Sequence, residues 1–369
     1  MANILKELCD KGIATGCPSW LPLNTHYMTI MGSHAYGCAD TSVKSKIPDY
    51  DVYGFAIPPK EYIFFHLQGH IQGFGPEPES FDQYQKHHMF EQDALGGTGK
   101  EWDFQIFNIV KFFELCRENN PNMIDSLFTP DNCVIHCTRI GQMVRDNRRL
   151  FLSKEAWKKF RGYAQSQLKK MNDKNIVASG TVEKIRNFED AHEISHKMTL
   201  AEIKAEIQKR GSVPALKSIA IKNLKIYEDL YERGIKESQR FEIYKFHNFD
   251  TKFAYHILRL FDEAEQILLD GDINLQRAKE LMKAIRRGDW TPEEIRNWVM
   301  EKEKALEAAY VNCKLPERPP VEPLRLLLVR CLEEHYGSLA NCVAEIGWSE
   351  QTLKDIDALL SKVRKQLYN

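Results

Sequence analysis

Two short apolar runs, each beside a small polar motif, constrain the fold of the chain more than any other feature. Tyr27–Met31 leads directly into Gly32-Ser33, and Val52–Ile57 follows Asp49 and Asp51. Runs of this length and composition predict strands. Because side chains alternate between the faces of a strand, Asp49 and Asp51 are expected on one face, with Cα atoms roughly 7 Å apart. The pattern predicts two strands that flank one site.

Two carboxylates on one face, joined by a third, favour a cation site. Each close pair of carboxylates repels by on the order of 4 kcal/mol at an effective dielectric near 20, and a divalent cation removes that cost. Oxygen donors suit Mg²⁺ or Mn²⁺, and two such ions can hold the attacking and leaving oxygens of a displacement on phosphorus. A Gly-Ser turn supplies backbone and hydroxyl donors for phosphate. The alternative is a plain turn and an acidic loop before a strand.

These motifs carry a resemblance to a known superfamily. Gly32-Ser33, Tyr36-Gly37 and Asp49-x-Asp51 resemble the signature of the polymerase-beta superfamily of nucleotidyltransferases. More narrowly, the chain resembles the bacterial and phage family of predicted nucleotidyltransferases associated with RNA repair. Three later blocks are similar to that family, in its order, over about residues 28–310: Asn120–Phe128, Lys252–Leu260 and Ala284–Trp290.

The resemblance implies the metal ligands. In the superfamily a third carboxylate comes from a neighbouring strand, and Lys100–Phe107 has the composition of a strand. Asp103 is the residue that this implies, with Glu101, of the same strand parity, as the alternative. Asp49, Asp51 and Asp103 would then be the catalytic residues and hold Mg²⁺ or Mn²⁺, with a nucleoside triphosphate (NTP) as the substrate.

The resemblance also implies residues that bind the nucleotide. Gly32 and Ser33 would hold the triphosphate. Lys252, His256 and Arg259 follow one another at i, i+4 and i+7, so a helix would carry them along one face. Spacing alone fits a solvated face equally well, but the family has Lys, His and Arg at these positions, which implies a role in stabilising the leaving pyrophosphate.

The loop between Ser33 and Asp49 departs from the family. It is several residues longer than usual, it contains Lys44 and Lys46, and Pro48 stands where a serine is common before the first aspartate. The spacing of the two aspartates is local and does not depend on this loop. The approach of Ser33 to a phosphate does depend on it.

Residues 60–100 look less regular than the strands around them. His87-His88 and Glu91–Asp93 have no third ligand at a fixed metal-binding spacing, which favours a polar loop over a metal site. Gly96–Gly99 lacks the lysine and the helix that follow in a phosphate-binding loop, so a hairpin turn is expected.

Composition is that of an ordinary globular chain with room for two domains. Of its 369 residues 43% are hydrophobic and 28% charged, and no apolar run approaches the length of a membrane span. The N-terminus has no signal-peptide pattern, so a cytoplasmic location without membrane contact is expected. Nine irregularly spaced cysteines argue against a disulfide framework, and the thiols of Cys133–Cys137 are expected to be buried and reduced.

Charge is unevenly distributed along the chain. Residues 1–130 contain 9 of the 51 Lys and Arg and 16 of the 52 Asp and Glu. The remainder of the chain therefore contains 42 Lys and Arg against 36 Asp and Glu. An acidic first part fits a cation site, and a mildly basic remainder fits a phosphate-bearing partner. Ordinary helix surfaces explain the second observation equally well.

From Phe151 onward the pattern is helical, which predicts an α+β protein. We expect a nucleotidyltransferase domain with a mixed sheet over residues 1–150 and an all-helical substrate- and nucleotide-binding domain over residues 151–369. Helix breaks are predicted at Gly180, Gly211, Pro214 and Gly234, and the tail after Pro316 is expected to pack on the helical domain.

Together these observations favour a metal-dependent nucleotidyltransferase. It would move a nucleoside monophosphate (NMP) from an NTP to a hydroxyl acceptor, an RNA 3′ end being favoured by the family, and release pyrophosphate. Two alternatives stay open. One is a non-catalytic nucleic-acid-binding or regulatory protein on the same fold, and the other is an enzyme that nucleotidylates a protein or a small molecule.

Overall fold

The computed structural model describes residues 3–39, 49–172, 179–210, 212, 217–238 and 241–342, together with Ile356, Leu359, Leu360 and Val363. The chain forms two compact units. Unit 1 comprises residues 1–156, 266–277 and 313–369, and unit 2 comprises residues 157–265 and 278–312. The chain therefore passes between the units several times, whereas the sequence predicted one boundary near residue 150.

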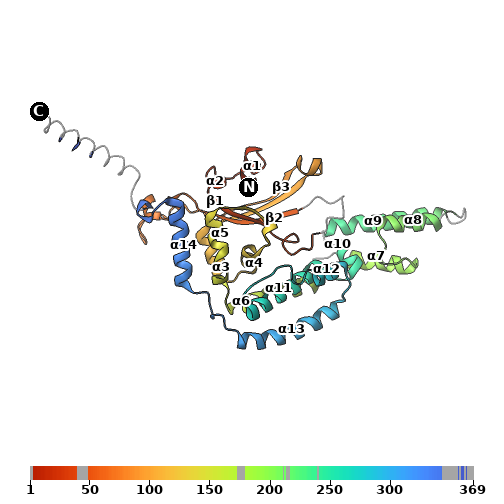
Figure 1. The fold of residues 1–369 in the computed structure, drawn as a ribbon. Helices are drawn as coiled ribbons and strands as arrows, with labels where there is room; N and C mark the ends of the chain where they lie inside the picture. Colours follow the sequence, from red (N-terminus) through yellow and green to blue (C-terminus); the bar gives the residue numbers. More distant parts are fainter. Residues whose placement is uncertain are drawn as a thin grey trace. The chain divides into compact units, whose positions relative to one another are not determined.

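Unit 1 is built on a mixed five-stranded sheet with the strand order β3-β4-β2-β1-β5 (Figure 1). Its strands are β1 (Thr25–Ile30), β2 (Asp49–Ala56), β3 (Gln83–Glu91), β4 (Lys100–Asn108) and β5 (Val134–Cys137). β2 and β4 are parallel, and the other neighbouring strands are antiparallel. The sheet and the many helices after it confirm the predicted α+β class.

Helices cover both faces of this sheet. On one face, α1 (Ile4–Asp10) buries Leu5 and Leu8 in a cluster with Val52 and Phe104. On the other, α3 (Ile109–Arg117), α4 (Pro121–Phe128) and α5 (Arg139–Asp146) lie against β1, β2 and β4. Phe55 of β2 packs there on Phe112 of α3, with ring centroids 5.0 Å apart. Because Asp49 and Asp51 have the same strand parity as Phe55, they lie on the face of the sheet that α3 and α4 cover.

Helix α14 (Val321–Tyr336) shows that the prediction for the tail was wrong. It packs on α3 and α5 of unit 1 and buries Leu324, Leu327, Cys331 and Leu332. Nδ1 of His335 lies 3.0 Å from Nε2 of His26 on β1. The apolar residues of α14 indicate which side of the helix is buried, but they do not specify which helices it packs against.

Unit 2 is helical over the residues described. It contains most of α6 (Glu155–Asn172) and α11 (Thr251–Asp270), and it contains α7 (Ser179–Ala191), α8 (Leu200–Arg210), α9 (Lys217–Glu237), α10 (Phe241–His247), α12 (Lys279–Arg287) and α13 (Pro292–Asn312). Helices α7 to α10 enclose a core around Ile185, Ile203, Tyr227 and Phe241.

Two of the predicted helix breaks in this unit were wrong. Gly180 lies within α7 and Gly234 within α9, while Gly211 and Pro214 lie outside the described residues. A Cβ atom on Gly234 would lie 2.3 Å from the ring of Phe241. Gly234 thus allows close packing of α10 on α9 instead of ending the helix.

Candidate functional site

The parallel pairing of β2 and β4 brings the predicted carboxylates together. Asp51 lies opposite Asp103, and Asp49 lies opposite Glu101. Asp49, Asp51 and Asp103 each offer an oxygen atom, and these atoms lie within 4.8 Å of one another. Asp49 is exposed, while Asp51 and Asp103 are half-buried. We call these three residues the carboxylate trio. Asp103, and not Glu101, completes it.

The donor chemistry of the trio fits a divalent cation. Negative charges at about 4 Å repel by roughly 1 kcal/mol in water and roughly 4 kcal/mol at an effective dielectric of 20. A group of three carboxylates is therefore most stable with a cation among them. Carboxylate oxygens without sulfur or nitrogen are the ligands that Mg²⁺ and Mn²⁺ prefer.

Gly32 ends β1 at a point where only glycine fits. Its φ of +65° lies in the left-handed region, and a Cβ atom would lie 2.8 Å from Oδ2 of Asp51. Beside it, the backbone N–H of Met31 donates to the carbonyl of Asp51 over 2.7 Å. The Gly-Ser turn therefore lies directly against the second carboxylate of the trio, as the two flanking strands predicted.

The loop after Gly32 is closed by hydrogen bonds. The carbonyl of Ser33 accepts from the N–H of Cys38 over 2.8 Å, and the hydroxyl of buried Tyr36 donates to Oδ2 of Asp125 over 2.9 Å. Asp125 is fully buried on α4. Sequence analysis did not select Asp125, although an acid inside the apolar run Met123–Phe128 was a visible signal.

Asn120 is the N-cap of α4. Its Oδ1 accepts from the N–H groups of Asn122 and Met123 over 3.1 and 3.4 Å. Pro121 then occupies the first turn, where a missing N–H has no cost. The cap fixes the start of the helix that holds the loop through Asp125.

His87 and His88 contact Asp103, and the prediction of a polar loop was wrong. Both lie on β3, at a register shift between Lys86 and Met89. The N–H of His88 donates to Oδ1 of Asp103 over 2.7 Å, and Nδ1 of His87 lies 3.2 Å from Oδ2. The extra residue of the bulge interrupts the alternation of polar and apolar residues, which concealed the strand.

Two histidines near the trio have shifted pKa values of opposite sign. A hydrogen bond with Glu101, and then the charge of Asp103, raise the pKa of His88. Burial lowers the pKa of His34, whose ring stacks on Tyr50 with centroids 4.7 Å apart. Tyr50 has the opposite strand parity from the aspartates, so the stack belongs to the other face of β2.

The three residues on α11 that were predicted to bind the nucleotide differ in how exposed their side chains are. Lys252 is exposed, His256 is half-buried, and Arg259 is only 3% exposed. Nη1 of Arg259 lies 3.7 Å from Oε1 of buried Glu263. All three residues lie on α11, as predicted. The side chain of Arg259, however, is buried in unit 2.

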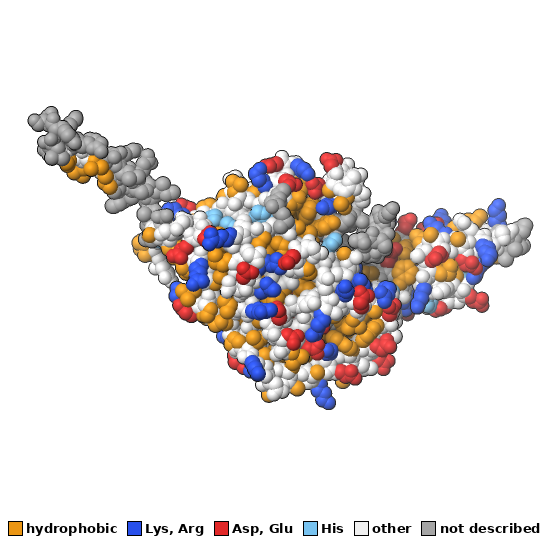
Figure 2. Space-filling view, in the orientation of Figure 1, with side chains coloured by type: hydrophobic (Ala, Val, Ile, Leu, Met, Phe, Trp, Pro, Cys, Tyr) orange, Lys and Arg blue, Asp and Glu red, His pale blue; other side chains and the backbone are white. Residues whose placement is uncertain are grey.

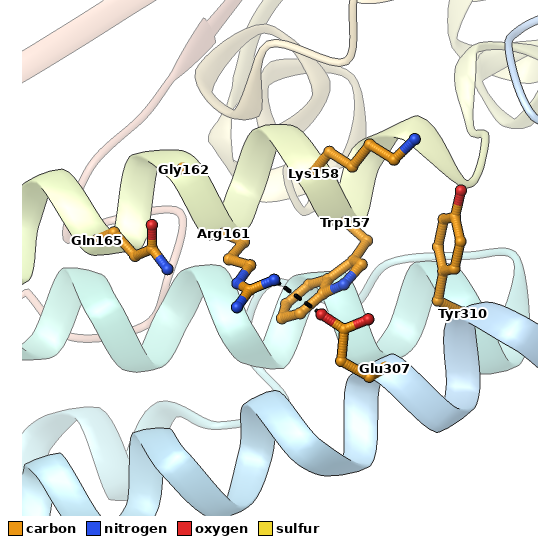
Figure 3. Close-up of a pocket in the computed structure, with 7 residues that line it drawn as sticks. All are labelled: Trp157, Lys158, Arg161, Gly162, Gln165, Glu307 and Tyr310. Atoms are coloured by element: carbon orange, nitrogen blue, oxygen red, sulfur yellow. Dashed lines mark hydrogen bonds and ion pairs between the residues drawn. The ribbon is translucent and has the colours of Figure 1, made fainter.

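A hollow of about 490 Å³ lies between α6 and α13 (Figure 3). It is lined by Trp157, Lys158, Arg161, Gly162, Gln165, Glu307 and Tyr310, none of which sequence analysis selected. Arg161 makes ion pairs with Glu303 and Glu307 at 2.9 and 2.8 Å. Arg161 is thus already neutralised, while the ammonium of Lys158 lies over the ring of Tyr310, 5.6 Å from its centroid.

Within the part of the chain that the structure describes, no helix has the length and apolar composition of a membrane span. Each cysteine whose side chain is described is a free thiol. The prediction of buried thiols is confirmed for Cys133 and is wrong for Cys137, which lies at the end of β5 and is half-buried.

Comparison with known protein families gives a match over residues 21–317 to RlaP, described as the RNA repair pathway DNA polymerase beta family. Neither the curated proteins nor the solved structures gave a match. The matched range contains the whole sheet, the carboxylate trio and most of the helices of both units. The family name implies a polymerase-beta-like nucleotidyltransferase of RNA repair. The chain belongs to the RNA repair pathway DNA polymerase beta family.

Proposed function

We propose that the chain transfers an NMP from an NTP to a hydroxyl of RNA, a 3′ end being the favoured acceptor, and releases pyrophosphate. The observation that carries this proposal is the convergence of Asp49, Asp51 and Asp103 beside the Gly32-Ser33 turn. A phosphoryl group bound at the turn would meet the carboxylates, since a Cβ on Gly32 would already touch Asp51. Free thiols are stable in the cytosol, where we place the reaction.

The trio would hold the divalent cations of the reaction, Mg²⁺ or Mn²⁺. When bound, such ions polarise the phosphate and lower the pKa of the attacking hydroxyl. Asp103 would complete one cation site and accept the proton of the acceptor. A carboxylate has about four lone-pair positions, so the hydrogen bonds from His87 and His88 leave capacity on both oxygens of Asp103.

The Gly32–Gly37 loop would bind the triphosphate. Gly32 allows the backbone to approach a phosphate, and Ser33 adds a hydroxyl donor. The hydrogen bond between Tyr36 and Asp125 holds this loop on α4, which fixes the donors before the nucleotide arrives. Lys252 and His256 remain candidates for contacts to the nucleotide. Arg259 fits a role within unit 2 that orients their helix.

RNA as the acceptor is supported by the family description and by the mildly basic composition after residue 130, where 42 Lys and Arg stand against 36 Asp and Glu. On the face shown in Figure 2, Lys and Arg side chains are mixed with Asp and Glu and do not form one broad basic area. This face therefore does not offer the row of phosphate contacts that nonspecific binding along a duplex requires.

A transfer assay tests the proposal. The protein is incubated with each α-labelled NTP and Mg²⁺, with RNA, protein or small-molecule acceptors, and the label is followed. We expect label on RNA, no label with a chelator, and loss of transfer by at least about 100-fold in Asp49→Asn/Asp51→Asn. The control is Asp82→Asn, an exposed aspartate of the same unit.

Each other result contradicts the proposal in a different way. Label on protein or on a small molecule would identify a nucleotidyltransferase with another acceptor. No label on any acceptor, together with RNA binding, would favour a non-catalytic protein. Equal transfer by Asp49→Asn/Asp51→Asn and by Asp82→Asn would show that the trio is not the active site.

A further inference from the structure

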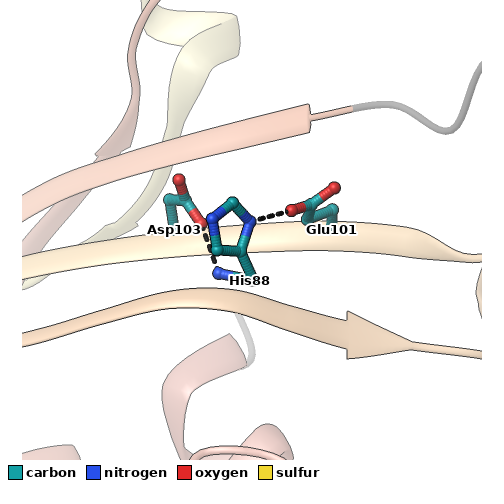
Figure 4. A group of neighbouring side chains, drawn as sticks. All are labelled: His88, Glu101 and Asp103. Carbon is teal, nitrogen blue, oxygen red and sulfur yellow. Dashed lines mark hydrogen bonds and ion pairs between the residues drawn. The ribbon is translucent and has the colours of Figure 1, made fainter. Parts of the chain in front are cut away.

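We infer that His88, Glu101 and Asp103 form a second cation site, which shares Asp103 with the carboxylate trio and takes a transition-metal ion such as Mn²⁺ in preference to Mg²⁺. One ligand atom from each residue lies within 4.8 Å of the others. Figure 4 shows the His88 imidazole between the carboxylates of Glu101 and Asp103. The inference rests on the proposed function only in that both use Asp103.

Two strands supply this site. Glu101 and Asp103 are two residues apart on β4 and therefore share a face. His88 comes from β3, where its Nδ1 makes an ion pair with Oε1 of Glu101 while its backbone N–H holds Oδ1 of Asp103. The side chains of Glu101 and Asp103 are 33% and 19% exposed, so the two carboxylates are partly shielded, and the imidazole, 83% exposed, closes the outer side.

The bulge on β3 places the imidazole over the carboxylates. The register shift between Lys86 and Met89 adds a residue to β3, and His88 adopts a φ of +55°. A non-glycine residue at positive φ is strained, because its Cβ approaches the backbone too closely. A regular strand would alternate His87 and His88 between the faces, whereas the bulge brings the imidazole of His87 and the backbone N–H of His88 to Asp103 and the imidazole of His88 to Glu101. The surrounding contacts hold His88 in a conformation that the residue alone disfavours.

The donor set decides which cation fits. The trio offers carboxylate oxygens alone, while the second site adds one imidazole nitrogen to two carboxylates. Mg²⁺ prefers oxygen ligands, whereas Mn²⁺ and later first-row ions also bind imidazole. His87 acts on the site indirectly. Nε2 of His87 lies 2.7 Å from the amide nitrogen of Gln85, and Nδ1 lies 3.2 Å from Oδ2 of Asp103, so both ring nitrogens of His87 already have partners.

Pulsed EPR of the Mn²⁺-loaded full chain tests the inference, because a ligated ¹⁴N nucleus modulates the spin echo of Mn²⁺. The measurement uses Mn²⁺ alone at mildly alkaline pH, where the imidazole can be neutral. We expect ¹⁴N modulation in the wild type, its retention in His87→Gln and its loss in His88→Asn. Asparagine tolerates positive φ, so His88→Asn keeps the bulge and its backbone N–H. Circular dichroism checks the fold of each variant.

A second variant tests the carboxylate ligand Glu101. Glu101→Gln removes a charged ligand and should weaken Mn²⁺ binding at least roughly tenfold, with less effect on Mg²⁺. Mn²⁺ bound without ¹⁴N modulation, no Mn²⁺ bound at all, modulation that survives in His88→Asn, or modulation lost in His87→Gln would each overturn the inference. A histidine–carboxylate ion pair with no cation role would give the first or second result.

The two proposals fail separately. NMP transfer by a protein that shows no ¹⁴N modulation would refute the second cation site and leave the nucleotidyltransferase intact. Modulation in a protein that transfers no NMP to any acceptor would do the reverse. Retained modulation in Asp49→Asn/Asp51→Asn is expected, since neither residue belongs to the second site.

Discussion

Replacing Gly32 with alanine should damage the site through one atomic contact. The new Cβ would lie 2.8 Å from Oδ2 of Asp51, against an ordinary contact of at least 3.4 Å. Asp51 must therefore shift by at least roughly 0.6 Å, and misplacements near 1 Å cost roughly 100-fold in rate. The positive φ of +65° adds roughly 1–2 kcal/mol of instability.

Gly16 provides a matched control for this substitution. Its φ is +72°, but a Cβ there would meet nothing within 4 Å. Gly16→Ala should have the same backbone cost, measured as the change in the free energy of unfolding in urea, and should keep the NMP transfer rate within about twofold. Gly32→Ala should lose about 100-fold in that rate.

The assay is the initial rate of NMP transfer to RNA, measured beside urea unfolding of both variants. Equal loss of transfer in the two variants would show that backbone strain, and not the position of Asp51, explains the effect. Full transfer by Gly32→Ala would refute the close approach of the turn to the carboxylate.

Three further perturbations test other parts of the structure. Tyr36→Phe removes a donor from buried Asp125, so the free energy of unfolding should fall by about 1–3 kcal/mol and the KM for NTP should rise. Lys245→Met leaves Glu189, its fully buried partner at 2.9 Å, without that cation, and urea unfolding should show a loss of about 3–5 kcal/mol. Burial, and then the charge of a neighbouring histidine of α14, lower the pKa of His26 to about 3. A lowered histidine pKa stabilises the fold above the ordinary value near 6.5. The free energy of unfolding should therefore fall by up to about 5 kcal/mol as the pH drops from about 6.5 towards 3, and His26→Gln should flatten this pH dependence in urea unfolding.

Local patterns predicted the centre of the fold well. The period of two along β2 and β4 is a property of the backbone, so the shared face of Asp49 and Asp51 followed from the sequence alone. The pairing of Asp51 with Asp103 did not follow from the sequence pattern. It came from the resemblance to a known family, because residues 52 positions apart carry no local signal of their register.

The features that were missed depend on contacts distant in sequence. The bulge at His87 and His88 breaks the alternation that identifies a strand, so its role at Asp103 appears only when β3 pairs with β4. The partner of α14 is decided by three-dimensional packing against α3 and α5. The burial of Arg259 likewise reflects its neighbours in unit 2, since the spacing along a helix specifies a face and not what covers that face.

The most direct test of the central claim is the Mn²⁺ binding isotherm, followed by the EPR signal of the free ion. The three proteins to compare are the wild type, Asp49→Asn/Asp51→Asn and the exposed control Asp82→Asn. We predict that the double variant binds fewer Mn²⁺ ions, or binds them at least roughly tenfold more weakly, while Asp82→Asn matches the wild type. Superimposable isotherms for the wild type and the double variant would contradict the account.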